Sequence, residues 1–199
     1  AYVELMGVAD PAAAARWAIG AAAVRALERG GGFATYGLAD DAIRITVPRL
    51  QANSSRIGPI VHGSRERPDG ERVEWWTAST PELGPERPPF LIWHLAAGAE
   101  WGADALAARR AFVHPAGSRA RLTGLEVAVP DPIWLAAECS TQVGLEFNAI
   151  GRTAIAMPGG QIVRLVSAPA GPHATVTLGI GPGPARSVSA LGLDFVLTP

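Results

Sequence analysis

Three side chains near the ends of predicted strands have the chemistry of a functional site. His94 lies at the end of an apolar stretch, residues 89–95, and an imidazole in that position is suited to general acid–base catalysis. Arg65 and Arg164 carry a permanent positive charge that can hold a carboxylate or a phosphate. Arg164 faces either a ligand or the solvent, and Arg65 either covers a binding site or is an ordinary solvated residue of a hairpin.

Tryptophans near these residues are candidates for the wall of a binding pocket, because an indole is largely apolar and carries one hydrogen-bond donor. Trp75 and Trp93 are the two candidates. Trp76 follows Trp75 on a predicted strand, so the two rings point to opposite faces of the sheet. One of them is therefore expected in the core and the other in a pocket or an interface.

Composition excludes several classes of protein. The net charge is −1, and all 17 basic residues are arginine, so neither nucleic acid nor an anionic membrane is expected as a partner. The absence of lysine removes Schiff-base chemistry, and the sequence has no Gly-x-Ser-x-Gly or phosphate-binding loop motif. Cys139, the single cysteine, is expected to be buried rather than nucleophilic. No signal peptide or membrane span is visible, which favours a cytoplasmic location.

Helices and strands can be placed from capping residues and apolar runs. Asp10-Pro11, Asp40-Asp41 and Asp131-Pro132 each predict the start of a helix; the first helix extends to Gly30–Gly32, and Pro48 is expected to kink or interrupt the second. A hairpin turn is predicted over 65–70, a short helix over 101–110 and a helical turn over 187–190. Strands are predicted over residues 2–8, 33–38, 60–63, 72–79, 89–95, 121–129, 145–150, 153–157, 161–167, 174–180 and 193–197.

A unit of one strand, one Asp-capped helix and three strands recurs along the chain. The predicted copies begin near Phe33, near Leu122 and, in shortened form, near Ala174. We therefore predict an α+β fold of repeated βαβββ modules. Residues 1–95 hold the end of a first module and a complete second one, 96–120 a linker with a short helix, and 121–199 a third module and a partial fourth. Roughly 40–50 residues would complete the first module.

This repetition resembles the vicinal oxygen chelate superfamily, which includes glyoxalase I, extradiol dioxygenases and bleomycin resistance proteins, and in particular its glyoxalase-like domain group. The resemblance covers nearly the whole chain and implies curved mixed sheets that form an open cup around a small ligand. It is carried by an ordered set of segments, which are 2–5 with 9–11, 63–70 before 73–76, 89–92 before His114-Pro115, and 127–132.

In members of the superfamily with metal activity, a divalent ion is held by a histidine from a module's first strand and a glutamate from its last. The resemblance places Glu4 at the glutamate position of the first module, but Arg164 occupies it in the third, and an arginine cannot bind a cation. No histidine lies at the expected first-strand positions, although His94 is near the last-strand position of the second module. A divalent metal is therefore an alternative for which Glu4 is the one visible ligand.

Three hypotheses about function follow. The first is a metal-independent protein that binds a small anionic or aromatic molecule, with Trp75 or Trp93 lining the cup and Arg164 or Arg65 holding the anion. The second is a metal-dependent lyase, isomerase or dioxygenase with Glu4 as one ligand. The third is an assembly module that completes its cup by forming a homodimer.

Overall fold

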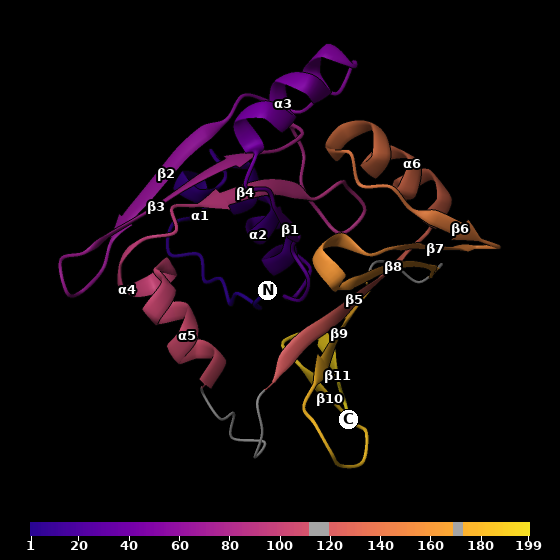
Figure 1. Ribbon diagram of the computed structural model, residues 1–199. Helices are drawn as coiled ribbons and strands as arrows, with labels where there is room; N and C mark the ends of the chain where they lie inside the picture. The colour runs from indigo at the N-terminus through magenta and orange to yellow at the C-terminus, as the bar shows by residue number, and fades with distance from the viewer. Residues whose placement is uncertain (112–119, 169–172) are drawn as a thin grey trace.

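The computed structural model describes residues 1–111, 120–168 and 173–199 (Figure 1); His114 and Pro115 lie outside these ranges. The helices are α1 (Pro11–Ala14), α2 (Ala18–Glu28), α3 (Ile43–Ala52), α4 (Gly98–Trp101), α5 (Ala103–Ala111) and α6 (Pro132–Val143), with a 3₁₀ turn at Pro158–Gly160. The strands are β1 (Gly37–Ala39), β2 (Val61–Glu66), β3 (Arg72–Ala78), β4 (Phe90–His94), β5 (Arg121–Val129), β6 (Asn148–Ile150), β7 (Thr153–Ala156), β8 (Ile162–Ser167), β9 (His173–Gly179), β10 (Arg186–Ala190) and β11 (Leu193–Thr198).

The βαβββ unit occurs twice with the same topology. A four-stranded sheet has the order β1-β4-β3-β2, with β1 parallel to β4, and α3 connects β1 to β2. The seven-stranded sheet contains the order β5-β8-β7-β6, with β5 parallel to β8, and α6 connects β5 to β6. The predicted α+β fold with mixed sheets is confirmed.

The remaining strands extend the seven-stranded sheet on the free side of β5. β9 is antiparallel to β5, β11 is parallel to β9, and β10 completes the order as the edge strand. The order β9-β11-β10 repeats the first, fourth and third strands of the unit without its helix and its second strand. The predicted helical turn over 187–190 is wrong, because these residues form β10, which is held by its ladder with β11.

Local capping signals account for the ends of α6. The carboxylate of Asp131 accepts a hydrogen bond from the backbone N–H of Trp134 at 2.9 Å, and Pro132 takes the first helical position. Gly144 ends the helix in the left-handed conformation, with φ of 70°. α3 continues through Pro48, so the helix is not interrupted there.

The N-terminal part differs most from the prediction. Residues 2–8 form no strand, because a strand is held by the ladder of a neighbour and no described strand pairs with them. The single helix predicted after Asp10 is two helices, α1 and α2. Gly20 allows this arrangement, since a Cβ there would lie 2.2 Å from the carbonyl oxygen of Ala14.

One hydrophobic core joins the two sheets. α3 packs against α6, and residues of both helices share a cluster with residues from one face of each sheet. The most deeply buried members include Ile43 of α3, Leu135 and Cys139 of α6, and Leu165 of β8. We call the face of each sheet that points away from this core its open face. The residues of the open faces are the candidates for ligand contacts.

Candidate functional site

Three of the residues selected from the sequence lie on the open face of the four-stranded sheet. Trp75 of β3 pairs directly with His94 of β4, and Arg65 of β2 lies one pair further toward the hairpin, opposite Val73. The Trp75 ring lies over Gly63 of β2, where a Cβ would come within 2.3 Å of the indole nitrogen. The missing side chain at Gly63 therefore gives the ring its place on the sheet.

Trp93, the other candidate for a pocket wall, lies on the opposite face, because side chains alternate along β4 and Trp93 is next to His94. Its ring packs against Trp76 with centroids 4.6 Å apart, and both rings contact the shared core. The guanidinium of Arg44 lies over the two rings at 5.4 and 5.8 Å. The structure therefore separates Trp93 from Trp75, His94 and Arg65.

His94 is covered by one residue that follows β4 and one from the N-terminal segment. The ring of Trp101 stacks on its imidazole at 4.1 Å between centroids, and Tyr2 approaches it edge-on at 6.4 Å. This partial burial lowers the pKa of His94, and the negative charge of Glu100 acts in the opposite direction to a smaller extent. At a given pH, a larger fraction of the His94 side chain is therefore neutral than of an exposed histidine.

The lowered pKa of His94 predicts that the folded protein loses stability on acidification. Because the unfolded chain binds the proton more tightly, with a pKa of about 6.5, stability falls as the pH drops through that value toward the folded-state pKa. Over this pH interval, the urea concentration at the midpoint of unfolding should fall less for the His94→Gln variant than for the wild type. An NMR titration of the His94 ring with a midpoint at or above about 6.5 would contradict the prediction.

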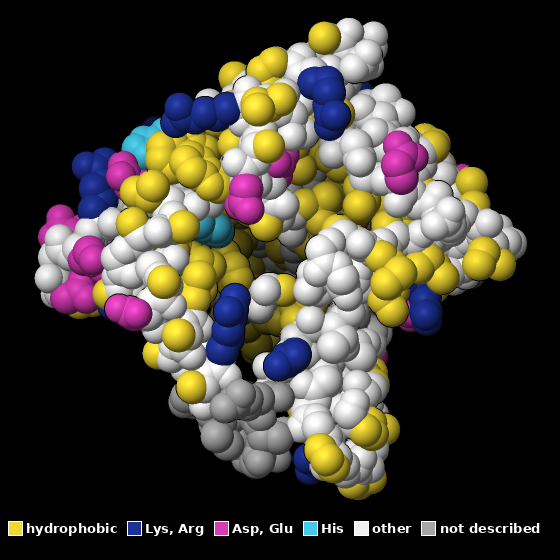
Figure 2. All heavy atoms as spheres, in the orientation of Figure 1, with side chains coloured by type: hydrophobic (Ala, Val, Ile, Leu, Met, Phe, Trp, Pro, Cys, Tyr) yellow, Lys and Arg dark blue, Asp and Glu magenta, His cyan; other side chains and the backbone are white. Residues whose placement is uncertain are grey.

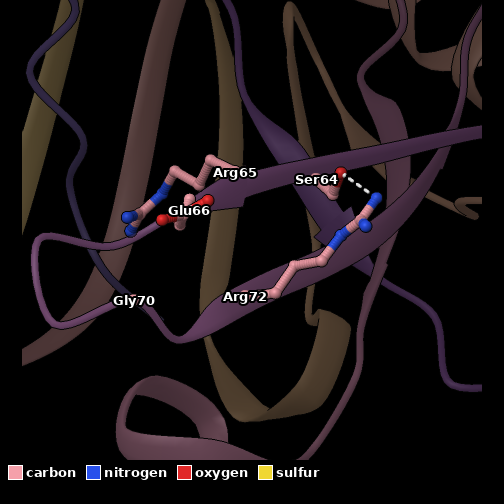
Figure 3. A pocket seen from close by; sticks show the side chains of 5 residues that line it. All are labelled: Ser64, Arg65, Glu66, Gly70 and Arg72. Atoms are coloured by element: carbon pink, nitrogen blue, oxygen red, sulfur yellow. Dashed lines mark hydrogen bonds between the residues drawn. The ribbon is translucent and has the colours of Figure 1, made fainter.

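Arg65 is already engaged. Its Nη2 lies 2.6 Å from Oε2 of Glu100 in α4. A shallow surface hollow of about 360 Å³ lies at the hairpin, lined by Ser64, Arg65, Glu66, Gly70 and Arg72. Figure 3 shows Arg72 directed toward Ser64, to which its Nη2 donates a hydrogen bond of 2.8 Å, while the guanidinium of Arg65 points away from this pair. Although both arginines line the hollow, their guanidinium groups point apart and do not converge on one ligand position.

Arg164 faces a different pocket, on the open face of the seven-stranded sheet. The pocket has a volume of about 380 Å³. It is lined by Thr123, Gly124, Leu125, Glu126, Ile162, Arg164, Thr175, Thr177 and Val196. Nη1 of Arg164 donates to Oε2 of Glu126 on the neighbouring strand at 3.3 Å, and both side chains remain more than a third exposed. This single contact leaves other guanidinium donors available.

The two repeats differ at the corresponding positions of the four-stranded sheet. Glu126 lies six residues before the start of α6 and pairs with Arg164; Gly37 lies six residues before the start of α3 and pairs with Phe90. A Cβ on Gly37 would come within 2.6 Å of the Phe90 ring. One repeat therefore has an ion pair where the other has an aromatic ring over a glycine.

The positions at which the superfamily holds a metal do not suit a cation here. Glu4 is exposed in a segment without regular structure. Within residues 1–111, 120–168 and 173–199, no group of three or more His, Cys, Asp or Glu side chains is placed to hold a metal ion. The Glu126 carboxylate is beside an arginine, which repels a cation.

Cys139 is fully buried in the core, and burial raises the pKa of its thiol to about 12. The Tyr36 hydroxyl is close to this thiol but has no partner in standard hydrogen-bond geometry among the described residues, and burial raises the pKa of Tyr36 well above its usual value. At neutral pH the thiol is therefore protonated and inaccessible, as a structural residue is.

The sequence interpretation missed Glu126, Glu100 and Trp101. Glu126 is 38 residues from Arg164, and only the register of β5 with β8 places them together. Glu100 and Trp101 were within a stretch interpreted as a linker, although an acidic residue next to a tryptophan in an otherwise Ala- and Gly-rich segment was a usable signal.

Comparison with known proteins was consistent with this architecture. A family model described as "Glyoxalase-like domain" matches residues 1–143. The chain belongs to this family. The glyoxalase-like chain is also similar to a crystal structure of a hypothetical protein from Staphylococcus aureus, with a TM-score of 0.74 and 12% identity over 94% of this chain and 76% of that one. No curated protein matches it. In the described part of the chain, no helix is long and apolar enough to cross a membrane.

Proposed function

We propose that this glyoxalase-like protein binds a small anionic molecule in the pocket on the open face of the seven-stranded sheet. The observation that supports the proposal is that Arg164 lines a pocket of about 380 Å³ and has further guanidinium N–H donors besides the one that bonds Glu126. This volume is within the range of small-molecule sites, which is about 300–1,000 Å³. Arg164 would hold a carboxylate or phosphate group through charge-assisted hydrogen bonds.

The rest of the pocket favours a ligand that also carries a donor. Glu126 accepts from a hydroxyl or an ammonium group, and its charge disfavours a purely anionic ligand of high charge. Thr175 and Thr177 add hydroxyls from β9, while Ile162 and Val196 supply apolar wall. A small hydroxy or amino acid has this combination of groups.

A binding screen with matched arginine variants tests the proposal. Small hydroxy acids, amino acids and phosphate monoesters are titrated by calorimetry into the wild type, Arg164→Gln and Arg152→Gln. Arg152 lies in the exposed turn between β6 and β7, where it donates to Ser167 Oγ at 3.1 Å, outside the pocket. Loss of a charged hydrogen bond should weaken binding by about 10- to 100-fold in Arg164→Gln.

Arg152→Gln removes the same charge but from a position outside the pocket, so it should bind as the wild type does. The proposal is wrong if no compound in the screen binds the wild type. It is equally wrong if Arg164→Gln retains the wild-type affinity for every compound that does bind.

A further inference from the structure

The segment after β4 lies against the open face of the four-stranded sheet. It consists of α4 and α5, and we call residues 98–111 the strap. In Figure 1 the strap lies beside the β2–β3 hairpin, and Figure 2 shows a hollow between the strap side of the molecule and the seven-stranded sheet, with hydrophobic side chains inside and arginines on its rim. The strap contacts the sheet through two adjacent residues with different chemistry.

The first of these residues, Glu100, occupies a carboxylate site. Its Oε2 accepts from Nη2 of Arg65 at 2.6 Å and from Nη1 of Arg67 at 3.3 Å, and its side chain is only 16% exposed. Arg67 also holds Asp69 at 3.0 Å, whereas Arg65 has no second acidic partner among the described residues. Two arginines on one carboxylate are typical of a recognition site for an anion.

The second residue, Trp101, occupies an aromatic site. Its ring stacks on His94 at 4.1 Å with planes 26° apart, and Tyr2 contacts it at 5.5 Å. The guanidinium of Arg109 lies over the same ring at 5.0 Å. From outside the strap, the ring is therefore held by the His94 imidazole and the Tyr2 phenol, both of which favour an aromatic π system, whereas Arg109 belongs to the strap itself.

The strap buries fewer side chains than α2, α3 and α6 do. Neither α4 nor α5 contains a buried residue, whereas α2, α3 and α6 each bury three or more. Both strap helices are also too short to be stable in isolation. One further contact, from the backbone N–H of Ala99 to Oε2 of Glu71 at 2.7 Å, fixes the start of α4. The strap is therefore held by the contacts of Ala99, Glu100 and Trp101 rather than by a buried apolar face.

We propose that the open face of the four-stranded sheet is a second binding site, for a small aromatic carboxylate, and that Glu100 and Trp101 occupy it as an internal substitute for that ligand. The carboxylate of the ligand takes the place of Glu100 on Arg65, and its ring takes the place of Trp101 on His94. The proposal does not depend on the Arg164 pocket. Ligand binding requires the strap to leave, so the strap lowers the affinity of the wild type.

Calorimetry with indole-3-acetate tests this site directly. The wild type should bind weakly, because the strap is tethered at an effective concentration in the millimolar range. The double variant Glu100→Gln, Trp101→Ala should bind at least about tenfold more tightly, because this competitor is removed. Adding Arg65→Gln to the double variant should abolish this gain in affinity. Cyclohexanecarboxylate, which cannot stack, should bind the double variant no more tightly than it binds the wild type.

Two controls separate this site from other effects. Glu82→Gln removes the exposed ion pair between Glu82 and Arg87, at 3.1 Å, and should leave the wild-type affinity unchanged. Arg164→Gln tests the site proposed above and should also leave the gain of the double variant unchanged. A gain that disappears with Arg164→Gln would overturn the present proposal and would support the Arg164 pocket as the binding site.

The proposal is overturned if the double variant binds indole-3-acetate no more tightly than the wild type does. Hydrogen exchange of the wild type gives an independent result should the double variant fail to fold. Saturating indole-3-acetate should lower the protection of amides in residues 98–111. Unchanged or increased protection in these residues would also overturn the proposal.

Discussion

Replacing Leu135 with alanine is expected to lower the free energy of unfolding by about 3 kcal/mol, because the substitution leaves a cavity in a close-packed core. Leu135 is 1% exposed and lies on α6, within the cluster that both sheets share. The two sheets should therefore lose stability together, although the substitution lies in the helix that covers only one of them.

Urea unfolding followed by two probes checks this expectation. Far-ultraviolet circular dichroism reports on the whole chain. Tryptophan fluorescence is measured on a Trp134→Phe background, so that it is weighted toward the four-stranded sheet, which carries Trp75, Trp76 and Trp93 and is contacted by Trp101. Both transitions should shift to lower urea by the same amount. Ile133→Ala on the same helix, at a position that is 40% exposed, should shift them far less. A fluorescence transition that stays at its wild-type midpoint would show that the sheets unfold separately.

The second large effect is expected at Gln142, a polar residue that is 3% exposed on α6. Its Oε1 accepts the backbone N–H of Arg56 at 2.6 Å and also lies 3.3 Å from Oγ of Ser55, both in the loop after α3. Gln142→Leu keeps most of the volume and leaves the N–H of Arg56 without a partner. An unsatisfied buried donor costs about 1–3 kcal/mol, so thermal unfolding should occur several degrees lower.

The same junction provides the matched control. Arg56 also forms an ion pair with Glu138 on α6 at 2.6 Å, with its own side chain 67% exposed. Glu138→Gln should change the stability by about 1 kcal/mol or less, because an exposed ion pair is well screened. Equal effects of Gln142→Leu and Glu138→Gln would show that the buried hydrogen bond is not what holds the loop to α6.

The elements that could be predicted from the sequence are those with local signals at both ends. α6 has a capping aspartate, a proline at its first position and a glycine after its last, and β5 has an apolar run of ordinary length. These signals act within a few residues, so a sequence displays them directly. The repeat of the unit added the topology, since one copy predicts how the other is connected.

The elements that could not be predicted depend on partners far away in the sequence. Residues of β10 were predicted as a helical turn, and the hairpin that joins β10 to β11 was not predicted. The turn of this hairpin places Leu191 at φ of 54° and Gly192 at 71°. A leucine is rare in that conformation, so the Leu-Gly pair gave little indication of a hairpin. Residues 2–8 have the composition of a strand but no described strand beside them.

The candidate site was predictable in its residue types more than in its arrangement. Alternation along β3 placed Trp75 and Trp76 on opposite faces, as the structure has them. The pairing of Glu126 with Arg164 depends on strand register, and the contact of Trp101 with His94 depends on a helix packing back onto its own preceding strand. Neither relation is contained in a local pattern.

The shared core between the two sheets has a consequence for any communication between their open faces. The core holds one face of each sheet together with α3 and α6, and Gln142 joins α6 to the loop after α3, so these elements form a physical route between the two open faces. Thermodynamic linkage then requires reciprocity. A ligand at Arg164 that changes affinity at His94 by some factor must itself be bound with an affinity changed by the same factor, and weakening Gln142 should reduce both effects equally.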